Sequence, residues 1–302
     1  GMKFQGQGRE TDGESSGQEP GSGTGKGVPG QYGLVGGCKS AGRTRAEQYK
    51  KAYRQFGKLE VVFESHHVLI VNKPPGILTQ KAGAEDISLN EWLAGYLLEK
   101  GEITEDSLHT FRPSVCNRLD RNTSGMVICG KTLPGSQMMS GLLRDRRLRK
   151  FYRMYVKGQV GEAFRAEGYL IKDEQANRVK LVREARENAR GEAGRAAYIR
   201  TEFRPLQVYK DITLMEAELI TGKTHQIRLH LAGTGHPVLG DYKYGERNFN
   251  DKYKKKYGVG SQLLHACRLE FPVLEGEFGD LSEAVLTAGE PGIFAKIAEG
   301  EK

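Results

Sequence analysis

The chain has 302 residues, of which 37% are hydrophobic and 28% are charged. This length allows a sizeable core and excludes a disulfide-held mini-protein, and no run approaches the roughly 18 apolar residues that a membrane helix needs. The formal net charge of +8 favours polyanionic partners such as nucleic acid, although charge alone identifies no partner.

Cysteine usage and the N-terminal sequence indicate the cellular compartment in which we expect the protein. The four cysteines form no CxxC pair, so they indicate neither a structural zinc site nor a redox motif. Residues 1–30 contain no apolar stretch of the kind found in signal peptides. We therefore expect reduced thiols and a cytoplasmic protein that does not associate with membranes.

The first 57 residues differ in composition from the rest of the chain. Fourteen of the 40 glycines lie in residues 1–45, and large apolar side chains are scarce there. Such a segment buries too little surface to offset the entropy lost on ordering. The composition predicts a flexible glycine-rich tail over 1–57, ending in a basic, partly helical stretch at 43–58, and a folded domain over 58–302.

Short apolar runs and two helical patterns follow the tail. A capping box at Ser88–Glu91 and apolar residues at helical spacing predict a helix over 88–100. Further helices are expected over 134–146 and at the start of 223–233. Strands are expected at 61–63, 68–72, 125–129, 152–160, 168–171, 178–182, 197–203, 212–220 and 263–271. Because strands and helices do not alternate regularly, the pattern predicts an α+β fold with a mixed, largely antiparallel β-sheet and flanking helices.

Two polar segments are candidate functional sites. The segment Asn117–Gly125 places Asp120 between Arg118 and Arg121 in a polar turn before an apolar strand, although a turn with a surface ion pair has the same pattern. The segment Thr221–Leu231 has hydrogen-bonding or charged side chains at seven of its eleven positions. A segment so polar between apolar neighbours is typical of a site.

Three histidines near the second segment raise the question of a metal. His225, His230 and His236 have no HExxH spacing and no nearby cysteine pair. Hydrogen bonding or RNA contact explains each of them better, so we expect no metal site.

Basic residues are interleaved with aromatic ones at two places. Residues 144–153 contain six cations around Phe151 and Tyr152, and four lysines over 252–256 lie between Tyr253 and Tyr257. Charge runs are commonly solvated faces. The interleaving with aromatic rings instead favours phosphate contacts combined with base stacking.

The motifs, in their order along the chain, resemble those of the RluA-type pseudouridine synthases. They are Asn72-Lys73-Pro74-Pro75-Gly76, Arg118-Leu119-Asp120, Lys150-Phe151-Tyr152-Arg153, Lys223-Thr224-His225-Gln226-Ile227-Arg228, Gly235-His236-Pro237, Gly240-Asp241 and Leu264-His265-Ala266. The resemblance extends from about Leu59 to Phe271. It implies the pseudouridine synthase fold, with 58–302 as the catalytic domain, and points to the branch that acts on large-subunit ribosomal RNA. The S4 RNA-binding domain that many relatives carry at the N-terminus is not expected here, because residues 1–57 are too poor in apolar side chains.

The resemblance also implies a chemistry. Enzymes of this family isomerise uridine in RNA to pseudouridine without a metal or an organic cofactor. By resemblance, Asp120 acts as nucleophile or base at ribose C1′, Tyr152 stacks on the uracil and helps remove its C5 proton, and Arg228 orients Asp120. Substrate contacts are expected from Asn117, where the family often has histidine, and from Arg118, Arg121, Lys223, His225, Arg146 and Arg147. Arg118 is the candidate to fill the gap left by the extruded base.

These expectations leave a competing class open. A non-catalytic RNA-binding or ribosome-assembly factor could use the same cleft, but pure binding needs no carboxylate facing a polyanion. We therefore favour an RNA-modifying isomerase that takes part in ribosomal RNA processing, with ribosomal RNA placed ahead of transfer RNA as substrate. We expect it to act as a monomer.

Overall fold

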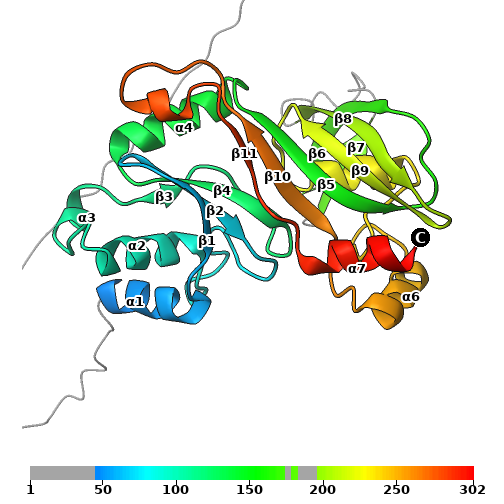
Figure 1. Cartoon of the computed structure of the whole chain (residues 1–302), viewed down its shortest axis with the longest axis horizontal. Coiled ribbons are helices and arrows are strands. Elements are labelled where there is room, and N and C mark those ends of the chain that lie inside the picture. The colour runs from blue at the N-terminus through cyan, green and yellow to red at the C-terminus, as the bar shows by residue number, and fades with distance from the viewer. Residues whose placement is uncertain (1–44, 174–177, 183–195) are drawn as a thin grey trace, which may run out of the picture. The chain divides into compact units, whose positions relative to one another are not determined.

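The computed structural model describes residues 45–173, 178–182 and 196–302. The chain divides into two compact units, Gly1–Gly42 and Arg43–Lys302. The first unit lies outside the described residues, and every element below belongs to the second (Figure 1).

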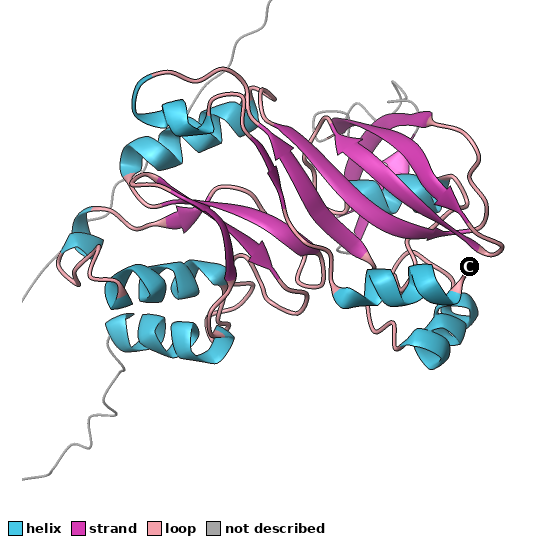
Figure 2. Ribbon diagram, in the orientation of Figure 1, coloured by secondary structure: helices cyan, strands magenta, loops and turns pink. Residues whose placement is uncertain are grey.

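Strands and helices do not alternate regularly along the second unit (Figure 2). The helices are α1 (Arg45–Phe56), α2 (Leu89–Glu99), α3 (Ser107–Thr110), α4 (Leu133–Arg144), α5 (Gln226–Gly233), α6 (Arg247–Tyr257), the 3-10 helix η3 (Gly276–Leu281) and α7 (Gly292–Gly300). The strands are β1 (Glu60–Glu64), β2 (Val68–Lys73), β3 (Ser114–Val115), β4 (Ser124–Gly130), β5 (Arg149–Lys157), β6 (Phe164–Asp173), β7 (Arg178–Val182), β8 (Ala197–Val208), β9 (Ile212–Leu219), β10 (Leu264–Glu270) and β11 (Val285–Thr287).

The strands form one sheet in the order β1-β2-β4-β10-β5-β9-β8-β6-β7, with β3 paired to β4 and β11 paired to β10. Each pairing is antiparallel except the one between β4 and β10, which is parallel. The predicted α+β class with a mixed, largely antiparallel sheet is therefore confirmed.

The parallel pairing between β4 and β10 joins two halves of the sheet. It consists of two residue pairs, His265 with Ser124 and Ala266 with Gly125. Ala266 also pairs with Tyr152 of β5 on its other side. A Cβ atom at Gly125 would lie 2.3 Å from the carbonyl oxygen of Ala266, and φ at Gly125 is +110°, so only glycine fits this joint. The joint thus brings β4, which follows the Asp120 turn, within one strand of Tyr152.

The first half of the sheet is covered on both faces, as its alternating pattern requires. In β2, Leu69 and Val71 face a core shared with α1 and α2, whereas Val68 and Ile70 face a core shared with α4. Figure 2 shows these helices on opposite sides of the strands. In the second half, a smaller cluster packs α6 and α7 against Tyr155 of β5.

Helix α1 corrects the expected boundary of the folded domain. The segment 1–57 was expected to be flexible, yet the compact unit begins at Arg43 and α1 packs against α2. Ala52 of α1 is fully buried, and the ring of Tyr53 lies 6.2 Å from that of Trp92. A few small and aromatic side chains in a basic segment were enough to anchor a helix that composition alone had assigned to the tail.

The strands expected from the sequence are present, with ends shifted by a few residues, and the helix over 88–100 is confirmed as α2. The capping box is present, with the side chain of Glu91 accepting from the backbone N–H of Ser88. Helices α3, α6 and α7 were not predicted. Within the described part of the chain, no helix is both long and apolar enough to cross a membrane.

Candidate active site

Asp120 lies in the turn between β3 and β4, with its side chain 21% exposed. The backbone N–H of Thr123 donates to the carbonyl of Asp120 (3.0 Å), which closes the turn, and the N–H of Gly76 donates to the carbonyl of Arg121 (2.8 Å). The loop is therefore held from both sides. The carboxylate of Asp120 stays accessible, although most of its surroundings are buried.

Arg228 reaches Asp120 from helix α5. Its Nη1 donates to Oδ2 of Asp120 at 2.8 Å, and the guanidinium is 7% exposed. Its remaining edge is bound to Asp241, where Nε donates to Oδ2 (2.6 Å) and Nη2 to Oδ1 (2.9 Å). Burial alone would lower the pKa of Arg228, but the hydrogen bonds and charges of the two aspartates raise it above its ordinary value. Arg228 therefore stays charged and is bound to Asp120; that it orients Asp120 for catalysis stays a prediction.

Asp241 is the second carboxylate of this cluster. It is 1% exposed, and its Oδ1 also accepts the backbone N–H groups of Lys243 (2.9 Å) and Tyr244 (3.1 Å). Burial would raise the pKa of Asp241, but Arg228 and these N–H groups hold it below its ordinary value. A buried charge so completely paired is fixed in place.

The start of α5 places His225 beside the same carboxylate. His225 has φ +56°, in the left-handed region, at the N-cap of the helix. Its Nδ1 shares a hydrogen bond of 2.8 Å with the hydroxyl of Tyr244, and its Nε2 lies 3.6 Å from Oδ1 of Asp120. Burial lowers the pKa of His225, an effect that the charge of Asp120 opposes. His225 is therefore a near neighbour of the Asp120 carboxylate, held in a strained backbone conformation.

Tyr152 is brought to the site by the middle of β5. The ring is 6% exposed and belongs to the core cluster that also contains Leu119 and Ala266. Burial raises the pKa of Tyr152, and the negative charge of Asp120 raises it further. The hydroxyl is consequently protonated at neutral pH, and Tyr152 shares its core cluster with Leu119, the residue that precedes Asp120.

Lys73 is a part of this cluster that the sequence did not assign. It ends β2, is fully buried, and donates from Nζ to the carbonyls of Pro74 (3.0 Å) and Arg121 (3.1 Å). Burial lowers the pKa of Lys73 to about 7, and the charge of Asp120 acts in the opposite direction. Lys73 and Asp241 both occur in motifs of the resemblance, but nothing in the linear sequence showed that Lys73 binds the loop of Asp120 or that Asp241 binds Arg228.

The other candidates around the Asp120 turn separate into two groups. Arg118 and Lys223 have exposed side chains, as substrate contacts need. Arg121 is 56% exposed and lies 4.0 Å from Asp86. The side-chain amide of Asn117 instead binds the β4 backbone, accepting from the N–H of Ile128 (2.7 Å) and donating to the carbonyl of Met126 (3.3 Å). Asn117 thus fixes the turn, and its contact with RNA stays a prediction.

Arg146 and Arg147 lie in the turn between α4 and β5. Both are exposed, and Arg146 has φ +57°. Among the described residues, neither has a hydrogen bond or ion pair that joins it to Asp120. Their contact with substrate stays a prediction.

The basic and aromatic cluster of α6 does not form the expected stacking surface. Tyr253 and Tyr257 are 1% and 6% exposed and pack in the core under α6, so the expectation that they stack on bases is wrong. Lys252 pairs with Asp211 and Lys256 with Glu301, both at less than 3 Å. These tyrosines recur every fourth residue because they form the buried stripe of a helix.

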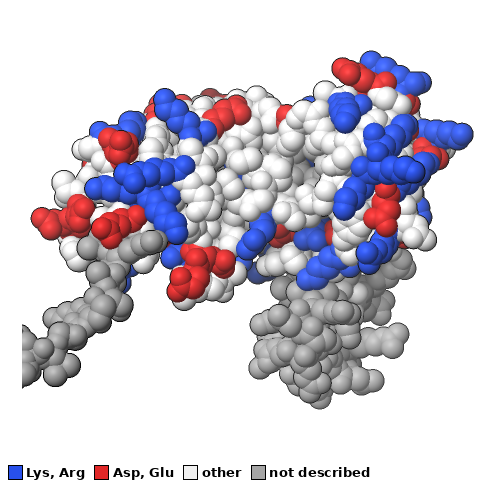
Figure 3. All heavy atoms as spheres, turned by 90° about the horizontal axis from the view of Figure 1, so that it is seen from below, with Lys and Arg blue, Asp and Glu red and all other residues white. Residues whose placement is uncertain are grey.

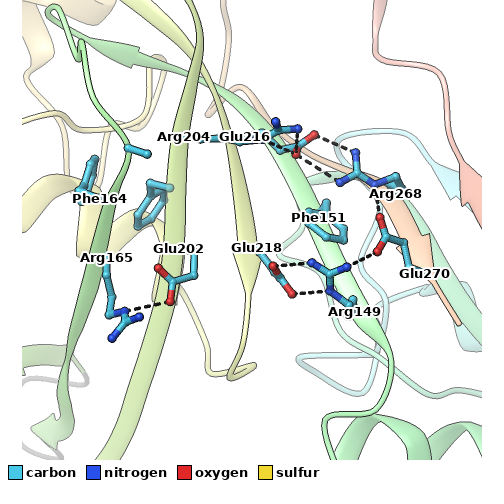
Figure 4. Close-up of a pocket in the computed structure, with 12 residues that line it drawn as sticks. Arg149, Phe151, Phe164, Arg165, Glu202, Arg204, Glu216, Glu218, Arg268 and Glu270 are labelled. Atoms are coloured by element: carbon cyan, nitrogen blue, oxygen red, sulfur yellow. Dashed lines mark hydrogen bonds and ion pairs between the residues drawn. The ribbon is translucent and has the colours of Figure 1, made fainter. Parts of the chain in front are cut away.

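A pocket of about 660 Å³ opens on one face of the sheet, where it is lined by residues that include Phe151, Phe164 and Arg268 (Figure 4). Successive strand residues point to opposite faces, so Phe151 lines this pocket and Tyr152 does not. Its arginines are already paired: Arg149 with Glu218 (2.8 Å) and Glu270 (2.6 Å), and Arg204 with Glu216 (2.6 Å). Its glutamates would repel phosphate, so the pocket does not extend the Asp120 site.

The three histidines considered for a metal each have a separate partner. His225 bonds Tyr244, His230 bonds Thr201 (3.0 Å), and His236 bonds the carbonyl of Lys157 (2.9 Å). The described residues hold no group of three or more His, Cys, Asp or Glu side chains suited to a metal ion. That the protein works without a metal stays a prediction.

Similarity to known proteins agrees with this geometry. The chain is 30% identical over 216 residues to ribosomal large subunit pseudouridine synthase C of Vibrio parahaemolyticus, which covers 70% of this chain and 60% of the relative. It is 31% identical over 219 residues to ribosomal large subunit pseudouridine synthase D of Zymomonas mobilis, covering 70% and 64%. The chain thus spans about three fifths of the length of these relatives.

Solved structures show the same fold. The structure of human RNA pseudouridylate synthase domain containing 4 superposes with a TM-score of 0.61 at 21% identity, covering 83% of this chain and 94% of that one. Human RNA pseudouridylate synthase domain containing 1 gives a TM-score of 0.54 at 19% identity, covering 80% and 94%. The model of the RNA pseudouridylate synthase family matches residues 67–233, which is more than half of the chain. The protein therefore belongs to the RNA pseudouridylate synthase family, as its motifs implied.

Proposed function

We propose that this protein isomerises specific uridines in RNA to pseudouridine, with Asp120 as the reacting carboxylate. The observation that carries the proposal is the bond between Arg228 and Asp120, which holds an accessible carboxylate at 2.8 Å from a buried guanidinium beside Tyr152. A binding protein for a polyanion has no need of a carboxylate in that place. This argument disfavours the alternative of a non-catalytic RNA-binding or ribosome-assembly factor.

The reaction conserves every atom of the substrate. The bond between ribose C1′ and base N1 breaks, the uracil turns, C5 joins C1′, and the proton on C5 leaves while N1 gains one. Asp120 acts at C1′, either as a nucleophile that forms a transient ester or as a base that removes a proton from the sugar. Both routes need the carboxylate ionised and aimed, which is what the fixed guanidinium of Arg228 provides.

Tyr152 and the exposed cations have separate tasks. The ring of Tyr152 stacks on the uracil, and its hydroxyl takes part in removing the C5 proton. Because the hydroxyl is protonated in the free protein, it must pass its own proton on before it can accept another, and Asp120 is the neighbouring carboxylate. Arg118 occupies the gap left by the extruded base, and Lys223 and His225 contact phosphate or uracil.

The substrate is large-subunit ribosomal RNA rather than transfer RNA, since both bacterial relatives described above carry ribosomal large subunit in their names. The reaction uses no metal or organic cofactor, and the protein acts in the cytoplasm as a monomer.

The test replaces Asp120 by asparagine, which keeps the shape of the side chain and removes its charge. We expect Asp120→Asn to bind RNA as tightly as the parent and to release no tritium from RNA carrying 5-tritiated uridine. Asp280→Asn, an exposed carboxylate in η3, serves as the control and should react at the parent rate. Turnover by Asp120→Asn within tenfold of the parent would refute the assignment.

A further inference from the structure

Helix α1 carries four exposed cations on its outward side, beside the exposed polar residues Glu47, Gln48 and Gln55. Its inward side is fixed, because Ala46 and Ala52 are buried and Tyr53 packs against the rings of Trp92 and Tyr96, both at 6.2 Å. The exposed side carries the basic residues of the helix, which are Arg45, Lys50, Lys51 and Arg54. Glu47 is the one acidic residue of the helix. The cations are therefore held on a rigid support.

Among the described residues, these four cations have no carboxylate partner, and all four lie on one helix of 12 residues. Other exposed cations, such as Arg146 and Arg147, also have no such partner, whereas Arg144 is neutralised by Asp145 and Arg165 by Glu202. Lys50 and Arg54 are four residues apart in α1, a spacing at which like charges repel on a helix. Such a face is a local concentration of positive charge that an external anion would relieve.

Helix α6 provides the contrast. It carries five cations, but Arg247 pairs with Asp251 (3.9 Å), Lys252 with Asp211 (2.7 Å) and Lys256 with Glu301 (2.9 Å). Figure 3 shows Lys and Arg gathered towards both ends of one face of the molecule, over α1 and over α6. The ion pairs distinguish the two groups: within the described part of the chain, three of the five cations of α6 are neutralised and none of the four of α1 is.

We propose that the exposed face of α1 binds the phosphate backbone of RNA and forms a contact outside the Asp120 site. This inference rests on the proposed function, in that the polyanion is the RNA substrate. A folded RNA large enough to reach beyond the modified base meets this helix, and the contact adds affinity without reading sequence, because phosphates carry no base identity. The catalytic step itself does not depend on α1.

The test compares two triple variants that remove the same amount of charge. Lys50→Gln/Lys51→Gln/Arg54→Gln changes the unpaired face of α1, and Arg247→Gln/Lys252→Gln/Lys256→Gln changes the paired cations of α6. Binding to a transcribed large-subunit ribosomal RNA is titrated from 50 to 200 mM salt. Each single-strand phosphate that a cation neutralises contributes about 0.7 to the slope of log affinity against log salt, so the slope of the α1 variant should be shallower by about 2. The slope of the α6 variant should change by less than half as much.

Two results would overturn the proposal: an unchanged slope in the α1 variant, or equal changes in both variants, which would mean that net charge alone is responsible. An unchanged slope would also leave the face available to an acidic protein instead of RNA. Thermal unfolding checks the fold of each variant, and the α1 variant should melt at or above the parent temperature because like-charge repulsion is removed.

The same experiment separates this inference from the proposed function. Single-turnover formation of pseudouridine at saturating RNA should proceed at the parent rate in the α1 variant. If the parent protein forms no pseudouridine but the α1 variant has the shallower slope, the proposed activity fails and the RNA contact stands. If the parent is active and the slope is unchanged, the RNA contact alone fails.

Discussion

Arg228 gives two of its three donating nitrogens to Asp241 and one to Asp120. The bidentate bond to Asp241 fixes the plane of the guanidinium, so the direction of Nη1, and with it the orientation of the Asp120 carboxylate, depends on a residue 13 positions away along the chain. Asp241 is therefore a positioning residue for the proposed reaction.

Replacing Asp241 by asparagine should reduce kcat more than it changes KM. Asparagine can accept one bond from Arg228 but not hold it by two charged ones, so the guanidinium loses its fixed plane. We expect kcat to fall by at least tenfold, or about 1.4 kcal/mol of barrier, with KM for RNA within threefold of the parent. The variant should also unfold more easily, since removing one partner of a buried pair costs about 3 to 5 kcal/mol.

Kinetics for Asp241→Asn should be measured well below its melting temperature, so that loss of fold does not imitate loss of rate. Asp251→Asn is the matched control, because Asp251 pairs with the exposed Arg247 at 3.9 Å. That control should change stability by less than about 0.5 kcal/mol and leave kcat unchanged. A parental kcat in Asp241→Asn would show that Asp120 needs no such support.

Tyr152→Phe separates stacking from proton transfer. The ring remains in the same core cluster, so RNA affinity should match that of the parent, while removal of the C5 proton is lost or slowed. Single-turnover tritium release gives the rate, and an RNA titration gives the affinity. Parental turnover in the phenylalanine variant would leave Tyr152 with stacking alone.

The packing of α1 on α2 predicts opposite effects for two helical glycines. Gly→Ala within a helix ordinarily stabilises by about 0.5 to 1 kcal/mol. A Cβ at Gly95 of α2 would lie 2.3 Å from the carbonyl oxygen of Tyr49, whereas a Cβ at Gly141 of α4 meets nothing within 4 Å. We expect Gly95→Ala to lose about 1 to 3 kcal/mol and Gly141→Ala to gain up to about 1 kcal/mol, measured by urea unfolding. Equal gains in both would mean that α1 does not hold its place on α2.

His230 should make stability fall in mild acid. It is 1% exposed, and burial lowers its pKa to about 4. The unfolded chain takes up a proton at this side chain near pH 6.5, but the folded chain does so only near pH 4, so the free energy of unfolding decreases as pH falls through that window. The contribution is up to about 1.4 kcal/mol per pH unit.

Urea unfolding between about pH 4.5 and 7 gives the slope of the free energy of unfolding against pH. In His230→Gln this slope should be shallower than in the parent, by an amount that corresponds to the uptake of up to about one proton on unfolding. His109→Gln provides the comparison, since His109 is exposed in α3. If the parent and His230→Gln have the same slope, His230 does not stay neutral in the folded protein.

The sequence predicted the sheet better than it predicted the surroundings of Asp120. Short continuous apolar runs such as Val68–Lys73 predict strands that are buried on both faces, because successive side chains point to opposite faces. The meeting of Asp120, Tyr152 and Arg228 was implied by resemblance. The bonds of Lys73 to the Arg121 carbonyl and of Asp241 to Arg228 were not predicted, because contacts between distant residues depend on strand order, which no local pattern contains.

The structure differs from the sequence-based expectations at helices α1 and α6, for opposite reasons. The partly helical stretch expected at 43–58 is confirmed as α1, but composition averaged over the glycine-rich segment before it did not reveal the buried Ala52 or the packing of Tyr53 on Trp92. In α6, the aromatic residues Phe249, Tyr253 and Tyr257 recur every fourth position, which is the period of a helix face turned to the core. The alternation of lysine and tyrosine therefore reflected burial of the rings, and not a stacking surface.

The position of β10 also sets the order in which the enzyme can become active during its synthesis. β10 lies between β4 and β5 in the sheet although it is made after all the other strands except β11. Until Leu264–Glu270 has left the ribosome, the strand that follows Asp120 and the strand that carries Tyr152 have no partner between them. In a nascent or truncated chain that ends before β10, the residues of the site are present but not assembled, so we expect such a chain to form no pseudouridine.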